Sequence, residues 1–149
     1  TDITYSGVLK VVESISNALD ITAKINKKNI VKDILNMYEA IKEYIQCAKV
    51  IKNELEFVIE DNLSGIDGVE LNTQALVQGV VDMYVVTKDN KHIIIDFKTD
   101  KVESERELIE RYAVQLKVYK RAIELAYNIQ VEGTFIYSFG LNKLIGVED

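Results

Sequence analysis

The sequence predicts an α/β fold, a mixed β-sheet flanked by helices in the order α-α-β-β-β-α-β. Apolar residues recur every three or four positions in the first third of the chain and again over residues 105–127, as they do on one face of a helix. Short runs rich in β-branched residues lie between and after these stretches, and such runs favour strands. Strands that follow one another and then alternate with a helix imply a mixed sheet.

Helices are expected in three places. Residues 7–20 have a short amphipathic pattern, and a longer helix should run from about Asn29, a plausible N-cap, to about Asn53. The apolar positions of the longer helix are Ile30, Ile34, Met37, Ile41, Tyr44, Ile45 and Ala48. The third helix, over residues 105–127, has the strongest helical pattern.

Strands are expected over residues 55–59, 75–86, 92–97 and 131–139, with a short last strand over residues 143–147. The second and third of them flank the sequence Lys88-Asp89-Asn90-Lys91. This sequence indicates a hairpin, because asparagine at position 90 can adopt a positive φ.

The composition is that of a single globular domain. The chain has 149 residues, of which 48% are hydrophobic and 28% charged. Its one cysteine, Cys47, excludes an internal disulfide and a four-cysteine iron–sulfur or zinc site, and it favours a reducing, cytoplasmic location. No apolar run approaches the roughly 18 residues of a membrane helix, so no membrane partner is expected. The net charge of −6 is unfavourable for a protein that holds DNA alone, because phosphate contacts dominate such affinity.

Two aspartates and one lysine interrupt otherwise apolar strands: Asp82, Asp96 and Lys98. Aspartate is disfavoured in strands and costly to bury without a partner. The two-residue period of a strand places Asp96 and Lys98 on one face and Phe97 on the other. If Asp82 joins them, two carboxylates and an ammonium share one pocket, and magnesium favours such oxygen ligands. The alternative is a charged strand end with Asp82 facing solvent.

The length of the hairpin loop decides whether Asp82 shares this pocket. Asp82 can lie opposite Asp96 only if the loop has an odd number of residues. A two-residue loop of Asp89 and Asn90 would place Asp82 opposite Phe97 and turn it away. We therefore predict a three- or five-residue loop, or a bulge.

Three more residues belong to the same pattern. Gly79 weakens a strand interior, so it marks a close approach by another backbone or a ligand. Gln115 and Tyr119 lie four residues apart and hence on one helix face. Gln115 interrupts an apolar stripe formed by Leu108, Tyr112, Tyr119 and Ile123. A glutamine in such a stripe requires a buried partner, and the alternative is a satisfied amide in the core.

Taken together, Gly79-Val80-Val81-Asp82, Asp96-Phe97-Lys98-Thr99-Asp100, and Gln115 with Tyr119 resemble the motifs of RecB-type PD-(D/E)XK nucleases. Over about residues 54–147 the sequence is similar to the C-terminal nuclease domain of AddA helicase–nuclease subunits. The resemblance implies a restriction-endonuclease-like fold. Residues 1–53 would be a helical N-terminal part and residues 54–149 the catalytic core of one nuclease domain, itself a fragment of a larger helicase–nuclease.

The resemblance also implies roles for individual residues. Asp82 and Asp96 would be metal ligands, with the carbonyl of Phe97 as a third. Lys98 would position the attacking water and offset charge in the transition state, and Gln115 and Tyr119 would support the site and the DNA strand. Glu54 resembles a further acidic ligand that opens the first core strand, with Glu56 as the competing choice.

The implied activity is that of an exonuclease in double-strand-break processing. Its cofactor would be Mg²⁺, for which Mn²⁺ can substitute, with no iron–sulfur cluster. Its partners would be DNA, helicase domains of the same chain and an AddB-like partner protein. One departure is that the family's early metal-binding histidine has no counterpart, since Val11 stands four residues after Gly7 and the only histidine is His92. This leaves a second function open, a nuclease-like module that binds or guides DNA or docks a partner without cutting.

Overall fold

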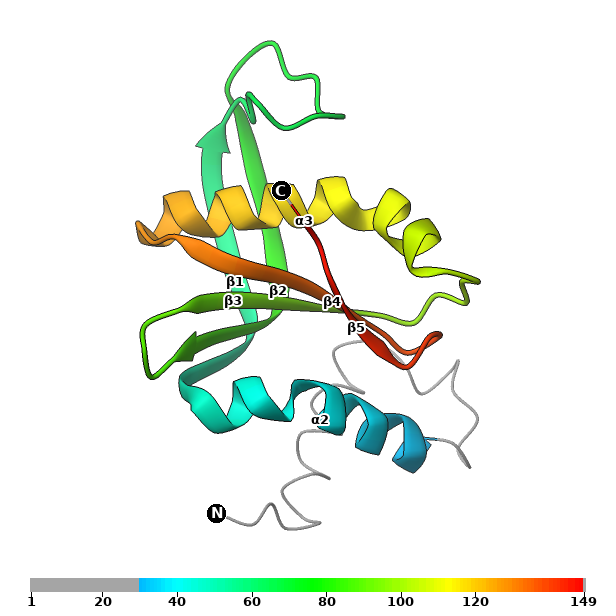
Figure 1. The fold of residues 1–149 in the computed structure, drawn as a ribbon. Helices are drawn as coiled ribbons and strands as arrows, with labels where there is room; N and C mark the ends of the chain where they lie inside the picture. Colours follow the sequence, from blue (N-terminus) through cyan, green and yellow to red (C-terminus); the bar gives the residue numbers. More distant parts are fainter. Residues whose placement is uncertain (1–29, 149) are drawn as a thin grey trace.

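In the computed structural model, which describes residues 30–148, a five-stranded mixed sheet lies between two helices (Figure 1). The elements are α2 (Ile30–Cys47), β1 (Ala48–Asp61), β2 (Ala75–Thr87), β3 (His92–Lys98), α3 (Glu105–Tyr127), β4 (Val131–Ser138) and β5 (Lys143–Gly146). The strands lie side by side in chain order, and only β3 and β4 are parallel. The predicted α/β class, with a restriction-endonuclease-like mixed sheet, is confirmed. The helix expected over residues 7–20 lies outside the described residues.

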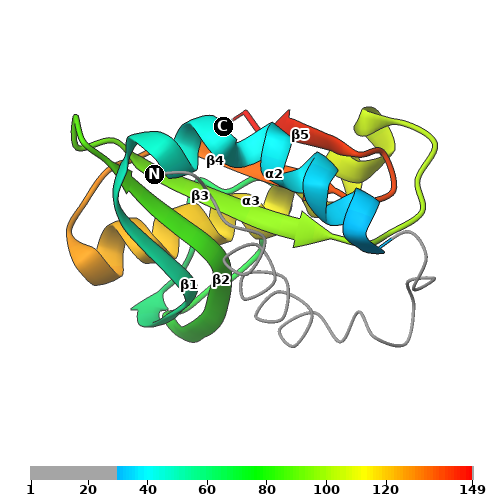
Figure 2. The same cartoon turned by 90° about the horizontal axis from the view of Figure 1, so that it is seen from below.

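The two helices cover opposite faces of the sheet. Seen from below, α2 lies in front of the sheet and α3 behind it (Figure 2). Met37 and Ile41 of α2 pack with alternate residues of the strands, including Ile93, Ile95 and Phe97. The intervening residue Ile94 faces the other way, into a second cluster with Leu108, Leu116 and Ile123 of α3. This alternation follows from the two-residue period of a strand, and it gives the sheet two separate apolar layers.

The helix α3 has the bounds that its periodicity predicts, and both ends are capped. The Ser104 hydroxyl accepts a hydrogen bond from the backbone N–H of Glu107 at 3.2 Å, while the Glu107 carboxylate accepts one from the N–H of Glu103 at 3.0 Å. Asn128 ends the helix in the left-handed conformation, with φ 51°. These caps define where α3 begins and where it ends.

The predicted end of the long N-terminal helix is wrong. Instead of continuing to Asn53, α2 ends at Cys47, and β1 begins at Ala48 rather than at residue 55. Residues 48–53 are drawn into the sheet because they pair with the end of β2, as in Ile51 opposite Val85. Strand pairing here outweighs the local helical pattern. The boundary expected between residues 53 and 54 therefore falls inside a strand.

The hairpin between β2 and β3 has the predicted odd loop. The N–H of Thr87 donates to the carbonyl of Lys91 at 2.9 Å, so that residues 88–90 form a three-residue loop. Asn90 has a φ of 65°, the positive value expected of it. The ladder runs from Val86 opposite His92 to Met83 opposite Ile95. One further step along this register brings Asp82 opposite Asp96.

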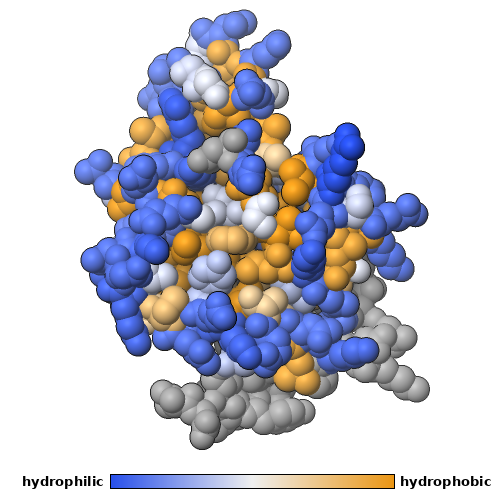
Figure 3. Space-filling model, in the orientation of Figure 1, coloured by the Kyte–Doolittle hydropathy of each residue, from blue (hydrophilic) through white to orange (hydrophobic). Residues whose placement is uncertain are grey.

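The face of the molecule in Figure 3 is mainly hydrophilic, with apolar groups between the charged ones. The most exposed large apolar side chains are Leu76 at 69% and Val58 at 62%, both on the ribbon formed by β1 and β2. Across the ladder Val58 is opposite Gln78 and Leu76 is opposite Glu60, so each of these apolar side chains lies beside a polar one. None of the helices within residues 30–148 is long and apolar enough to cross a membrane.

Gly79 makes room for an aromatic ring. It pairs with Phe57 across the β1–β2 ladder, and a Cβ atom at Gly79 would stand 2.6 Å from Cζ of that ring. The Phe57 ring in turn meets Tyr119 of α3 edge to face, with 5.4 Å between centroids. The group that approaches Gly79 closely is therefore the Phe57 side chain, and this ring links β1 to α3.

We expect Gly79→Ala to lower the free energy of unfolding by about 1–3 kcal/mol, because the added methyl group must displace the buried Phe57 ring. Urea denaturation followed by circular dichroism measures this change. Val80→Ala, at a neighbouring residue that is 40% exposed, serves as the control and should cost less than about 1 kcal/mol. Equal costs for the two variants would show that the ring is not tightly packed there.

Candidate active site

Asp82, Asp96 and Lys98 come together on the α3 side of the sheet, where β2 and β3 separate. The last ladder pair is Met83 opposite Ile95. Beyond this pair, a side-chain hydrogen bond joins the two strands: Oδ2 of Asp82 accepts from the backbone N–H of Phe97 at 2.9 Å. Asp96 and Lys98 share a face of β3, and the Lys98 Nζ lies 2.9 Å from Oδ2 of Asp96. Two carboxylates and one ammonium thus converge at the end of β3.

The Asp96 carboxylate is buried and only partly compensated. The residue is 3% exposed. Its Oδ2 forms the ion pair with Lys98, but it has no hydrogen-bond partner of suitable geometry among the described residues. A buried carboxylate oxygen in this state is costly, because desolvation is not fully repaid by one ion pair.

The pKa of the Asp82 carboxyl depends on its burial and on the neighbouring charge of Asp96. Burial raises its pKa to about 7, and the negative charge of Asp96 contributes in the same direction. The hydrogen bond from the N–H of Phe97 and the charge of Lys98 act the other way. At neutral pH the pair of carboxyl groups therefore holds part of a proton when no cation is present.

Lys98 is held by the helix opposite. Its Nζ donates a hydrogen bond to Oε1 of Gln115 at 2.8 Å, and Nε2 of Gln115 donates to the Tyr119 hydroxyl at 3.2 Å. The partner that Gln115 requires inside an apolar stripe is thus the lysine ammonium. Burial, and next the charges of Asp96 and Asp82, raise the pKa of Tyr119, so its hydroxyl faces the carboxylates in the protonated form.

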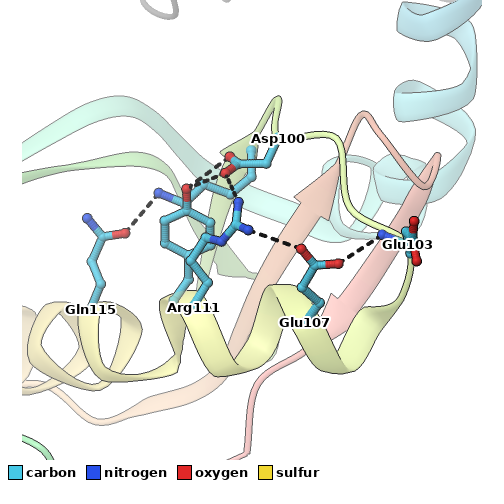
Figure 4. A network of polar contacts seen from close by, with 7 residues as sticks. Asp100, Glu103, Glu107, Arg111 and Gln115 are labelled. Carbon is cyan, nitrogen blue, oxygen red and sulfur yellow. Dashed lines mark hydrogen bonds and ion pairs between the residues drawn. The ribbon is translucent and has the colours of Figure 1, made fainter.

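A second set of polar residues beside Lys98 was missed by reasoning from the sequence. Figure 4 shows Glu107, Arg111 and Gln115 extending from α3 toward the segment that carries Asp100. Nη1 of Arg111 lies 2.7 Å from Asp100, and the ring centroid of Tyr112 lies 4.0 Å from Nζ of Lys98. One available signal was the position of Tyr112, three residues before Gln115 on the same helix face. Another was the position of Asp100, two residues after Lys98.

Glu54, another of the proposed ligands, comes from the neighbouring strand β1. Glu54 is placed between Asn53, which pairs with Met83, and Leu55, which pairs with Val81, so it stands across the ladder from Asp82. It has a φ of 55°, and its exposed side chain makes no hydrogen bond or ion pair with another described residue. Within residues 30–148, no group of three or more histidine, cysteine, aspartate or glutamate residues is placed to hold a metal.

Three further residues have positions that bear on the site. Glu56 is exposed, and its carbonyl accepts a hydrogen bond from the Tyr127 hydroxyl at 2.8 Å. Phe97 donates its N–H to Asp82, and its ring packs on the α2 side. His92 is half-buried at the hairpin end of β3, where Nδ1 contacts the Tyr84 hydroxyl, rather than lying free on the surface.

Several curated proteins named as ATP-dependent helicase/nuclease subunits are similar to part of this chain. The one from Geobacillus thermodenitrificans (strain NG80-2) is 34% identical over 113 residues, which cover 68% of this chain and 9% of that protein. The protein of the same name from Alkaliphilus oremlandii (strain OhILAs) is 33% identical over 129 residues, 83% of this chain and 11% of that protein. The chain thus spans about a tenth of the length of these relatives.

Among solved structures, that of SSO0001 aligns with 90% of this chain and 57% of its own chain, at 20% sequence identity and a TM-score of 0.43. A likeness at this level carries no argument about function.

A family model described as the YfbU domain matches residues 4–134 of the chain. That range contains the two carboxylates, Lys98, Gln115 and Tyr119. The chain belongs to the YfbU domain family.

Proposed function

We propose that this chain is a metal-dependent DNA nuclease domain of the RecB-type PD-(D/E)XK class, which hydrolyses phosphodiester bonds as an exonuclease. The observation that carries the proposal is the convergence of Asp82, Asp96 and Lys98 in one partly buried cluster. The family name YfbU domain states no activity. Support comes from the relatives named as ATP-dependent helicase/nuclease subunits, of which this chain matches a small part.

The two carboxylates have the chemistry of a Mg²⁺ site, at which Mn²⁺ can substitute. With Asp82 and Asp96 both ionised, Lys98 compensates only one of the two negative charges. Among the described residues, the buried Oδ2 of Asp96 has no hydrogen-bond partner, and the pKa of Asp82 is raised to about 7. A hard divalent cation would favour these oxygen donors and remove both penalties. The Phe97 carbonyl and Glu54 are the further ligands that we propose.

The reaction assigns a different task to each side chain. Bound Mg²⁺ would polarise the phosphate and lower the pKa of a water molecule. Lys98 places a compact positive charge beside the phosphate, where it stabilises negative charge that develops in the transition state. Gln115 holds the ammonium at 2.8 Å, and Tyr119 in turn holds the amide of Gln115. Asp82 on β2 accepts a hydrogen bond from the backbone N–H of Phe97 on β3, and this contact joins the strands that carry the two carboxylates.

The proposed setting is a larger ATP-dependent helicase–nuclease that processes double-strand breaks. Helicase domains of the same chain and an AddB-like partner protein would deliver DNA to the site. This setting accounts for the net charge of −6, because the other domains would then supply most of the phosphate contacts.

A second candidate is a nuclease-like module that binds or guides DNA, or docks a partner, without cutting. The specific observation in its favour is that no third acidic residue joins Asp82 and Asp96 within the part of the chain that the structure describes.

Asp96→Asn and Lys98→Met should each lower Mg²⁺-dependent DNA cleavage by at least about 100-fold, because each removes a charge that the transition state needs. Time courses on end-labelled single- and double-stranded DNA, with and without Mg²⁺, measure the loss. The matched controls are Asp67→Asn and Lys88→Met, at exposed loop positions, which should retain full activity. Cleavage by Asp96→Asn at the control rate would refute the site.

Mg²⁺ or Mn²⁺ should stabilise the protein through the two carboxylates. At a ten-fold excess over its Kd, a bound cation raises the free energy of unfolding by about 1.4 kcal/mol. Thermal unfolding and titration calorimetry should show this gain for the wild-type chain and its loss in Asp82→Asn and Asp96→Asn. A wild-type chain that takes up no Mn²⁺ at millimolar concentration would favour the non-cutting module instead.

In EDTA, Asp82→Asn should stabilise the protein in a pH-dependent manner. The pKa of Asp82 is about 7 in the folded chain and 3.8 as its ordinary value, so folding favours the protonated form. Its contribution to stability is full below pH 4 and is lost as the pH rises to about 7. The variant should equal the wild type near pH 4 and exceed it by on the order of 2 kcal/mol at pH 8. Urea titrations at several pH values measure the difference, and one that does not change with pH would contradict the assignment.

A further inference from the structure

The Lys98 ammonium has an ion pair, a hydrogen bond and an aromatic ring around it. The ion pair is with Oδ2 of Asp96 at 2.9 Å, and the hydrogen bond is to Oε1 of Gln115 at 2.8 Å. The ring is that of Tyr112, whose centroid lies 4.0 Å from Nζ. An ammonium at this distance from an aromatic ring is attracted to its negative face, most strongly where water is excluded. The Lys98 side chain is 16% exposed, so the attraction is only weakly screened.

The Tyr112 ring is fixed at its far end by Asp100. Its hydroxyl donates to the Asp100 carboxylate, with 2.9 and 2.8 Å to the two oxygens. Asp100 also accepts a hydrogen bond from Nη1 of Arg111 at 2.7 Å, and Nη2 of Arg111 reaches Glu107 at 3.1 Å. Two consecutive residues of α3, Arg111 and Tyr112, therefore donate hydrogen bonds to the Asp100 carboxylate. Figure 4 shows Arg111 extending toward Asp100. Since Asp100 lies two residues after Lys98, this contact ties the end of β3 to the helix.

We propose that Tyr112 is a positioning residue for Lys98 and that Asp100 sets the position of its ring. The inference rests on the proposed function, in which Lys98 meets the phosphate. The Tyr112 hydroxyl donates to Asp100, whereas the face of its ring contacts the Lys98 ammonium. With Gln115 one turn further along α3, the ring confines a long, flexible side chain to one place. A small displacement of such a group is costly to catalysis, because the charge must lie where negative charge develops.

The first test observes Lys98 directly in the metal-free protein. In spectra of lysine-labelled chain, the Lys98 methylene protons next to Nζ should be shifted upfield by the Tyr112 ring current. Tyr112→Leu should remove this shift. Tyr112→Phe and Asp100→Asn should reduce it, because the ring remains but its hydrogen bond to residue 100 is removed in the first variant and weakened in the second. Tyr127→Phe is the matched control, since it removes a hydroxyl that α3 donates elsewhere, to the carbonyl of Glu56. It should leave the resonance unchanged.

The second test is kinetic. Tyr112→Leu should lower kcat by about 5- to 30-fold, the equivalent of a desolvated cation–π contact, and leave KM nearly unchanged. Tyr112→Phe and Asp100→Asn should show smaller losses. The double variant of these two should lose no more than the larger single effect, because both substitutions act on the same hydrogen bond, which Tyr112→Phe removes and Asp100→Asn weakens. Tyr127→Phe should cleave at the wild-type rate.

The two tests separate the possible failures. Lys98 resonances that are the same in wild type and Tyr112→Leu would overturn the positioning role, whether or not the protein cleaves DNA. Equal losses for Tyr112→Phe and Tyr112→Leu in both tests would also overturn it, because the ring would then contribute nothing of its own. A ring-shifted Lys98 in a wild-type chain that does not cleave DNA would support the positioning and refute the nuclease activity instead.

Discussion

The register of β2 against β3 is the constraint on which the candidate site depends. The three-residue loop closed by Thr87 and Lys91 places Asp82 in line with Asp96. A loop one residue shorter would exchange the two faces of one strand relative to the other. The apolar layers reinforce the register, because Met83 and Ile95 both belong to the α2 side, and a slip would expose them to the wrong face. Loop length and core packing thus select the same pairing.

The second constraint is the position of α3, because it supplies Gln115 and Tyr112, the uncharged partners of Lys98 within residues 30–148. Ser104 and Asn128 fix the two ends of the helix, while Leu108, Leu116 and Ile123 bury one stripe of it against the sheet. The polar residues of the site lie within or beside that stripe. Packing of the stripe against the sheet therefore also places Gln115 within hydrogen-bond distance of Lys98. Stability and site geometry come from the same contact between helix and sheet.

The electrostatics of the site differ from those of the rest of the surface. Exposed ion pairs such as Arg106 with Glu110 contribute little, since water screens them. The cluster at the end of β3 is different, because its two carboxyl groups are largely removed from water and share one ammonium. This arrangement opposes folding when both carboxyl groups are ionised, and it is the kind of local cost that proteins retain where charge is used.

The sequence by itself determined the α/β class, the bounds of α3, the odd hairpin loop and the shared face of Asp96 and Lys98, because these depend on periodicity and local turn chemistry. Only the tertiary structure decided the end of α2, since residues 48–53 follow their partners in β2 rather than their own helical pattern. It likewise decided that Phe57 fills the space beside Gly79 and that Asp100 and Tyr112 enclose Lys98. Such contacts join residues from different elements, and their distances follow from packing that no single segment encodes.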